Sequence, residues 1–174
     1  DRPTNLMLRD VFIQRGALEM LKRLFTGATS ALILINIRGT SKVNQQQGYE
    51  SGDKLLADVA RCLQEVCDAR DYMVARHYSD QFLVLISDCG SEAPEALATQ
   101  LIESLNAHLA VARHEQSVVE FYGGGASLKH TEDLRTDRGG SVNAVRQMIH
   151  LAERQMAAAR KEKESTWQFS ELTR

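Results

Sequence analysis

The sequence predicts an α+β domain in which a central, mainly antiparallel sheet of five strands is flanked by helices. A continuous apolar run at residues 31–35 is typical of a strand that is buried on both faces. Two further apolar runs, at 72–77 and 82–87, are joined by four mostly polar residues, which is the pattern of an antiparallel hairpin. Between these strands, apolar residues recur at spacings of three and four, as expected for helices that cover a sheet.

Length and composition favour one domain with one core. The chain has 174 residues, a formal net charge of −2 and 43% hydrophobic residues, so we expect residues 1–174 to form a single domain. Because the chain begins without Met, we also expect this domain to be excised from a larger multidomain protein. Its 21 basic and 23 acidic residues are mixed along the chain, which does not favour nucleic-acid binding. Three cysteines lack CxxC spacing, and the sequence has neither a signal peptide nor an apolar run of membrane-spanning length. These features predict a cytoplasmic location without direct membrane contact.

Four helices are predicted from apolar periodicity. They cover residues 9–25, residues 53–67, a segment that includes 97–109, and residues 142–162. Ser141 is a suitable N-cap for the last of them. A polar segment from Thr40 to Gly52 separates the buried strand from the second helix.

Residues 118–128 and 166–169 are predicted to add further strands. The first of these runs contains a glycine triplet at 123–125, and no GK[ST] or GxGxxG pattern accompanies it. A strand that a helix approaches closely is therefore favoured over a phosphate-binding loop. The five histidines form no HxxxH or HExxH pair, so no zinc site is expected.

The loop of the hairpin carries Asp80 at its tip, between two apolar strands. A carboxylate at the tip of a buried hairpin is well placed for phosphate or metal chemistry. The alternative interpretation of Asp80 is a polar residue in an ordinary surface turn. Tight hairpin turns favour Gly, Asn or Asp, whereas the centre of this loop is Tyr78-Ser79, so we expect a wide loop or strained backbone angles. The Tyr78 ring either presents an interaction surface or folds back over the neighbouring cleft and fills it.

Four stretches of the chain carry motifs that resemble those of one known family. They are residues 1–9 (DRPTNLMLR), 34–38 (LINIR), 44–56 (NQQQGYESGDKLL) and 76–82 (RHYSDQF). In the same order, they resemble the D-x-L-T-G-L-x-x-R, L-x-D-x-D, N-x-x-x-G-x-x-x-G-D-x-x-L and R-x-G-G-D-E-F motifs of the GGDEF domain of diguanylate cyclases. The resemblance covers nearly the whole chain and implies the GGDEF, nucleotidyl-cyclase-like fold.

Members of this family bring two GTP-bearing domains face to face and use two divalent metals to join the nucleotides. Such metals need hard, anionic oxygen ligands. The resemblance places Asn36 at the first metal-binding aspartate and Arg38 at the second, so that one position has lost its charge and the other carries a permanent cation. Mg²⁺ binding is therefore expected to be lost, leaving no metal site and no cofactor.

The hairpin motif itself departs from the family pattern. Tyr78 and Ser79 replace both glycines, Asp80 remains, and Gln81 replaces the acid that follows it. A side chain at Tyr78 stands where glycine would let the backbone approach a nucleotide. We therefore expect no catalytic residues and no enzymatic activity.

Three positions are candidates for nucleotide binding by resemblance. Asn44 and Asp53 match the residues that read the guanine edge, and Arg160 matches the phosphate-binding lysine of the last helix. Glu164 stands where the family has a second cation, so GTP binding is expected to be weak. Without a ligand, Asn44 would instead cap a turn and Asp53 would cap the following helix.

The expected function is that of a catalytically inactive GGDEF domain that acts as a regulatory or interaction module in bacterial cyclic di-GMP-type signalling. Its partners would be other domains of the parent protein, such as an EAL domain, or a separate protein. The alternative is a sensor that binds GTP without turnover. An active cyclase and a module of an RNA-turnover regulator are less favoured, the latter because the strands offer no run of exposed aromatics.

Overall fold

A six-stranded sheet in the order β1-β3-β4-β2-β5-β6 forms the centre of the protein. The computed structural model describes residues 4–23, 26–112, 120–130, 138–160 and 167–172. The strands are β1 (Met7–Leu8), β2 (Thr29–Arg38), β3 (Met73–Arg76), β4 (Gln81–Ile86), β5 (Glu120–Lys129) and β6 (Trp167–Glu171). The four inner strands pair antiparallel, whereas β1 pairs parallel with β3 and β6 pairs parallel with β5.

The sheet has one strand more than the five that the sequence predicts. The additional strand is β1, which is two residues long and pairs only with Ala75 and Arg76 of β3 among the described residues. Two residues are too few to show an alternating pattern, so the local sequence gives no signal for this strand. The α+β class and the mainly antiparallel sheet are confirmed.

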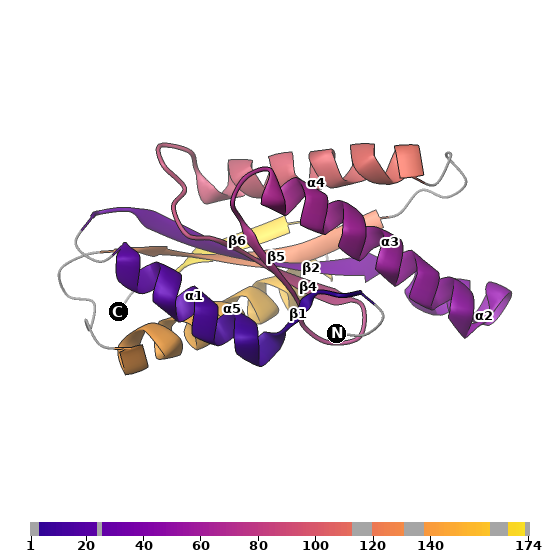
Figure 1. Ribbon diagram of the computed structural model, residues 1–174, viewed down its shortest axis with the longest axis horizontal. Helices are drawn as coiled ribbons and strands as arrows, with labels where there is room; N and C mark the ends of the chain where they lie inside the picture. Colours follow the sequence, from indigo (N-terminus) through magenta and orange to yellow (C-terminus); the bar gives the residue numbers. More distant parts are fainter. Residues whose placement is uncertain (1–3, 24–25, 113–119, 131–137, 161–166, 173–174) are drawn as a thin grey trace.

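Helices cover both faces of the sheet (Figure 1). The helices are α1 (Arg9–Lys22), α2 (Thr40–Gln47), α3 (Tyr49–Asp68), α4 (Pro94–Ala112) and α5 (Arg138–Ala159). Figure 1 shows α1 and α5 on one side of the sheet and α3 and α4 on the other, with α2 at the far end of α3. Within the described residues, no helix is long and apolar enough to cross a membrane.

Strand β2 is buried on both faces, as its continuous apolar run predicts. Ile33 and Ile35 pack into the core formed with α3 and α4, whereas Leu32 and Leu34 pack into the core formed with α1 and α5. The alternation follows from the two-residue period of a strand. Asn36 is two residues after Leu34, so the same alternation places it on the face of the sheet that α1 and α5 cover.

The glycine triplet lies where α5 crosses β5. A Cβ atom on Gly124 would overlap the carbonyl oxygen of Ala152 and the backbone nitrogen of Met156. The helix backbone can therefore contact the strand only because Gly124 has no side chain. The prediction of a close helix approach is confirmed, and the phosphate-loop alternative is wrong.

Several helix boundaries differ from the predictions. The polar segment after β2 forms α2, and α3 begins at Tyr49 instead of Asp53. The polar composition of α2 hides the helix from a search for apolar periodicity. Helix α5 begins at Arg138, so Ser141 lies inside the helix and is not its N-cap. The predicted ends at residues 24–25, 118–119, 161–162 and 166 lie outside the described residues.

Candidate functional site

The tip of the β3–β4 hairpin lies against the end of β2. Within the hairpin, the His77 N–H donates to the Gln81 carbonyl at 2.9 Å and the Gln81 N–H donates to the Tyr78 carbonyl at 2.7 Å. The Ile37 N–H of β2 donates to the Asp80 carbonyl at 3.2 Å. These bonds fix the loop beside the strand end that carries Asn36.

The backbone of the loop is strained at Ser79, as the missing glycines predict. Ser79 has a φ of +46°, in the left-handed region that glycine adopts most readily. The expectation of strained angles at the tip is confirmed.

Asn36 occupies a buried position between two polar neighbours. It pairs with Gln81 on β4 and with Tyr122 on β5 across the two antiparallel ladders. Its residue exposure is 5%, and its side-chain Nδ2 donates to the Ile37 carbonyl at 2.8 Å. A neutral amide, already bonded to the backbone, thus lies at the end of β2.

Arg38 lies over β5 at the same end of the sheet. Its Nε is 3.8 Å from Oε2 of Glu120, its cross-strand partner, and its guanidinium carbon is 5.2 Å from the centre of the Tyr122 ring. Both charged side chains are exposed, so this ion pair is weak. It nevertheless gives the Arg38 cation a protein partner.

A cleft of about 650 Å³ opens between the start of α1, the first turns of α3 and the hairpin tip. It is lined by Leu8, Arg9, Asp10, Asp53, Leu56, Arg76, His77, Tyr78 and Ser79. Tyr78 is 56% exposed, and the guanidinium carbon of Arg9 lies 5.6 Å from the centre of its ring. Tyr78 therefore forms part of the cleft wall without filling the cleft.

Arg76 lies in this cleft wall and interacts electrostatically with two carboxylates. Its guanidinium carbon is 4.8 Å from the centre of the Phe82 ring, and its Nη1 is buried without a hydrogen-bond partner among the described residues. Burial lowers the pKa of Arg76, whereas the charges of Asp80 and Asp53 act in the opposite direction. Asp80 thus shares its surroundings with a protein cation.

The two guanine-edge candidates do not cap helices. The residues that precede α2 and α3 are Gly39 and Gly48, and neither helix has a side-chain cap. Asn44 lies within α2, where its Oδ1 is buried without a hydrogen-bond partner among the described residues. Asp53 is an exposed residue of α3 that lines the cleft. The capping interpretation of both residues is therefore wrong.

Arg160 is exposed just beyond α5, where its N–H donates to the Met156 carbonyl at 2.9 Å. It is not among the residues that line the cleft. Glu164, and the first three residues of the N-terminal motif, lie outside the described residues. The structure thus brings Asn36, Arg38 and the hairpin tip together at one end of the sheet, with Asp53 across the cleft.

Comparison with known proteins identifies the family. Residues 1–166 match the family described as "Diguanylate cyclase, GGDEF domain". The chain belongs to the GGDEF family. Among curated proteins, this GGDEF domain is similar to the probable diguanylate cyclase DgcE of Escherichia coli, with 32% identity over 76 residues that cover 44% of the chain and 7% of DgcE.

Solved structures share the fold of this GGDEF domain at low sequence identity. The GGDEF domain of DgcB from Caulobacter crescentus, in complex with c-di-GMP, matches with a TM-score of 0.71 and 19% identity over 97% of this chain and 94% of that chain. The S helix–GGDEF–EAL portion of Vibrio cholerae LapD, bound to c-di-GMP, matches with a TM-score of 0.68 and 18% identity over 98% of this chain and 36% of that chain. The chain spans 7–16% of the curated relatives that it matches.

The GGDEF domain also contains a polar contact that the sequence analysis missed. His77 Nε2 lies 3.0 Å from Oε1 of Glu153 on α5, and Oε2 of Glu153 lies 3.1 Å from Nδ1 of His150. The His77 ring is 4.1 Å from the Tyr78 ring. A search for zinc motifs cannot detect this cluster, although the spacing of His150 and Glu153 on one helix face is a signal for part of it.

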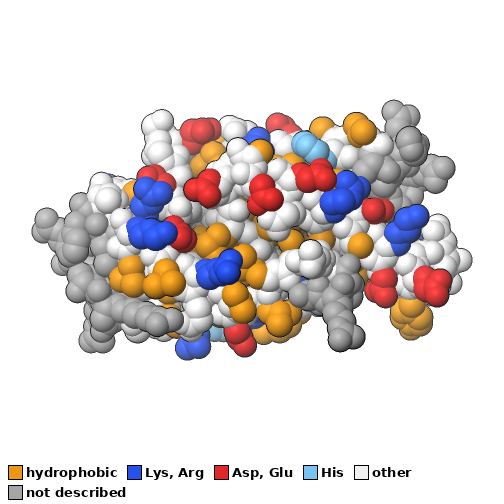
Figure 2. Space-filling model, in the orientation of Figure 1, with side chains coloured by type: hydrophobic (Ala, Val, Ile, Leu, Met, Phe, Trp, Pro, Cys, Tyr) orange, Lys and Arg blue, Asp and Glu red, His pale blue; other side chains and the backbone are white. Residues whose placement is uncertain are grey.

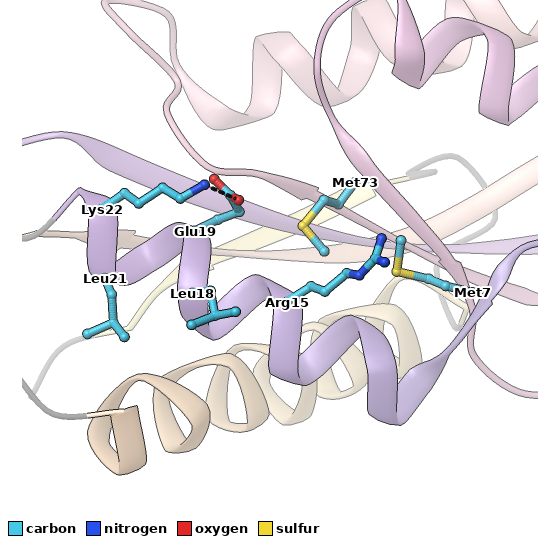
Figure 3. A pocket seen from close by; sticks show the side chains of 7 residues that line it. All are labelled: Met7, Arg15, Leu18, Glu19, Leu21, Lys22 and Met73. Carbon is cyan, nitrogen blue, oxygen red and sulfur yellow. Dashed lines mark hydrogen bonds and ion pairs between the residues drawn. The ribbon is translucent and has the colours of Figure 1, made fainter.

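A second groove lies between α1 and the edge of the sheet that β1 and β3 form in this GGDEF domain (Figure 3). It has a volume of about 690 Å³, and its apolar lining comes from Met7, Leu18, Leu21 and Met73. Lys22 and Glu19 pair at 2.6 Å on its rim. Figure 2 shows acidic and basic side chains interspersed on this face, so neither sign of charge dominates it.

Proposed function

We propose that this GGDEF domain is catalytically silent and acts as a regulatory module of a longer protein in cyclic di-GMP signalling. The observation that carries the proposal is the pairing of Asn36 with Gln81 at the end of β2. Both positions hold neutral amides where the family motifs have acids. Two divalent metals would need several anionic oxygens at this place.

The surroundings of the amide pair support the same conclusion. Arg38 follows Asn36 by two residues and adds a positive charge beside the site. Asp80 keeps its carboxylate, and the Arg76 cation is close enough to interact electrostatically with it. A metal would therefore meet few free anions and at least one repelling cation.

The partners of the domain are proposed from the domain organisation of relatives. LapD joins a GGDEF domain to an EAL domain, and the chain spans only a small part of its curated relatives. We place the regulatory surface at the hairpin tip, because Tyr78 presents a large amphipathic ring there. Tyrosine is enriched among residues that dominate binding energy at interfaces.

A second candidate function is GTP sensing without turnover. The cleft remains open beside Tyr78, and Asp53 lines it. Asn44 does not line the cleft: its Oδ1 is buried against Gly52 without a hydrogen-bond partner among the described residues, so a bound donor would satisfy it only after the side chain turns toward the cleft. Binding of this kind would be weak and nearly independent of Mg²⁺, because the metal positions hold Asn36 and Arg38.

Calorimetric titration of the 174-residue chain with GTP, with and without Mg²⁺, tests both candidates. A silent module gives no heat of binding, whereas a sensor gives weak binding that Mg²⁺ does not strengthen. Asn44→Ala should abolish such binding, and Gln45→Ala, an exposed neighbour on α2, is the matched control. Micromolar binding that depends on Mg²⁺ would contradict the loss of the metal positions.

A further inference from the structure

His77 fastens the hairpin loop to the body of the domain. Its side chain is 0% exposed, and Nε2 lies 3.0 Å from Oε1 of Glu153 on α5. The other carboxylate oxygen of Glu153 lies 3.1 Å from Nδ1 of His150. A carboxylate accepts hydrogen bonds, so the facing nitrogen of each ring carries the proton.

The second ring nitrogen of His77 has no comparable partner. Nδ1 is buried and lacks a hydrogen-bond partner among the described residues. The charged groups that face the ring come from two elements: Glu153 and His150 from α5, and Arg9 from α1. Burial lowers the pKa of His77, Arg9 and His150 act in the same direction, and Glu153 opposes them. The neutral ring therefore suits this site, and a proton on Nδ1 would be buried without an acceptor.

The position of this ring controls the rest of the loop. The Gln81 N–H donates to the Tyr78 carbonyl, and the Asp80 carbonyl accepts from the Ile37 N–H of β2. The Tyr78 ring lies 4.1 Å from the His77 ring. Because the His77 N–H also donates to the Gln81 carbonyl, a displacement of His77 would disturb Gln81, loosen the two neighbouring backbone bonds and move Tyr78.

We propose that the His77–Glu153 contact is a proton-sensitive latch, which holds the hairpin loop against α5 and Tyr78 beside His77 when His77 is neutral, and which opens when the ring gains a second proton. The latch does not depend on whether the cleft binds a nucleotide. It sets the pH range in which the proposed regulatory surface keeps the conformation described above.

Amide hydrogen exchange of the complete chain at pH 7.5 and pH 5.5 tests the latch. The protection of each amide is obtained by comparing its exchange rate with the intrinsic rate of an unprotected amide at the same pH. Relative to the change at Leu34 in the middle of β2, which reports the stability of the whole domain, we expect the protection of the Ile37 and Gln81 amides to fall by a further several-fold at pH 5.5, and by no more than about tenfold for one titrating histidine. His77→Gln keeps a donor for Glu153 but cannot titrate, so its protection relative to Leu34 should be the same at both pH values. His108→Gln, which removes an exposed histidine outside this cluster, is the matched control and should retain the wild-type response.

An equal loss of protection at Leu34 would show global unfolding and overturn the proposal. A wild-type response below twofold, or a His77→Gln response equal to that of the wild type, would also overturn it. Should His77→Gln fail to fold, Glu153→Ala provides the second test. It should lower the protection of Gln81 at pH 7.5 to the value that the wild type shows at pH 5.5, and unchanged protection would contradict the latch.

Discussion

Asn36 and Gln81 lie opposite each other across the β2–β4 ladder. Side chains of directly paired residues point to the same face and come within about 5 Å at their Cβ atoms. The two amides, which the proposed function assigns to positions of family acids, are therefore neighbours in space, although they come from different motifs. Under that proposal, the loss of negative charge is concentrated at one point of the site.

Restoring both acids should create a metal requirement. In Asn36→Asp/Gln81→Glu, two carboxylates face each other, and charges about 5 Å apart at an effective dielectric near 20 repel by roughly 3 kcal/mol. The double variant should melt below the wild type without metal and regain stability with Mn²⁺. Thermal melts with and without Mn²⁺ measure this, with Asn36→Asp as the control that responds less. A double variant indifferent to Mn²⁺ would contradict the placement of these side chains.

Gly124 should tolerate no side chain. Gly124→Ala would force α5 away from β5, because the new Cβ overlaps backbone atoms of Ala152 and Met156. Overpacking of a core costs about 1–3 kcal/mol or more, and backbone atoms cannot rotate aside. At Gly125 the new Cβ meets the Phe169 ring, a side chain that can move, so Gly125→Ala should cost less. Urea denaturation compares the two variants, and an equal or smaller loss for Gly124→Ala would contradict the close approach.

His130 should make the domain less stable in acid. The ring is buried, its Nε2 lies 2.6 Å from Ser30 Oγ, and Ser30 Oγ donates to the Ser87 carbonyl at 2.7 Å. Burial lowers the pKa of His130 in the folded state, so the unfolded chain binds the proton first as the pH falls below about 6.5. Stability from this residue is thus present above that pH and is lost as the pH falls toward the folded-state pKa.

Urea denaturation at pH 7.5 and pH 5.5 measures this loss. His130→Gln can still donate to Ser30 and does not titrate, so its free energy of unfolding should fall less on acidification than that of the wild type. His108→Gln, which removes an exposed histidine, should behave as the wild type. An identical acid loss in His130→Gln and the wild type would refute the role of His130.

Tyr78 should matter for regulation and not for folding. Because its ring is 56% exposed, Tyr78→Ala should change the free energy of unfolding by no more than about 0.5 kcal/mol. The same variant should alter the regulated activity of the longer protein that contains this domain. Tyr49→Ala, which removes an 81% exposed ring at the start of α3, is the matched control. If Tyr78→Ala and Tyr49→Ala leave that activity equally unchanged, the hairpin tip is not the interaction surface.

Much of the fold could be predicted because it depends on local periodicity. The apolar run of β2 and the two strands of the hairpin can be recognised in the sequence, because buried positions along these strands require apolar residues. Helix α2 could not be predicted, because it has no apolar pattern of its own and contacts α3, an arrangement that local periodicity does not show. Strand β1 depends on pairing with a distant strand in the same way.

The site was predictable only in its parts. The motifs identify Asn36 and the hairpin tip, but the register that places Asn36 opposite Gln81 is a property of the sheet. The contact between His77 and Glu153 joins residues 76 positions apart, and no local pattern indicates such a pair. The open cleft beside Tyr78 likewise depends on how three elements meet.

The central claim is that this GGDEF domain makes no cyclic di-GMP. Incubation of the unmodified chain at high concentration with GTP and Mn²⁺, followed by mass spectrometry of the products, tests it directly. Under this proposal, Asn36 and Gln81 would leave the metals with few anionic ligands, Arg38 would repel them, and Tyr78 would stand where the backbone meets the nucleotide. The account predicts no cyclic di-GMP above the level of a boiled control, whereas multiple-turnover product from the unmodified chain would contradict it.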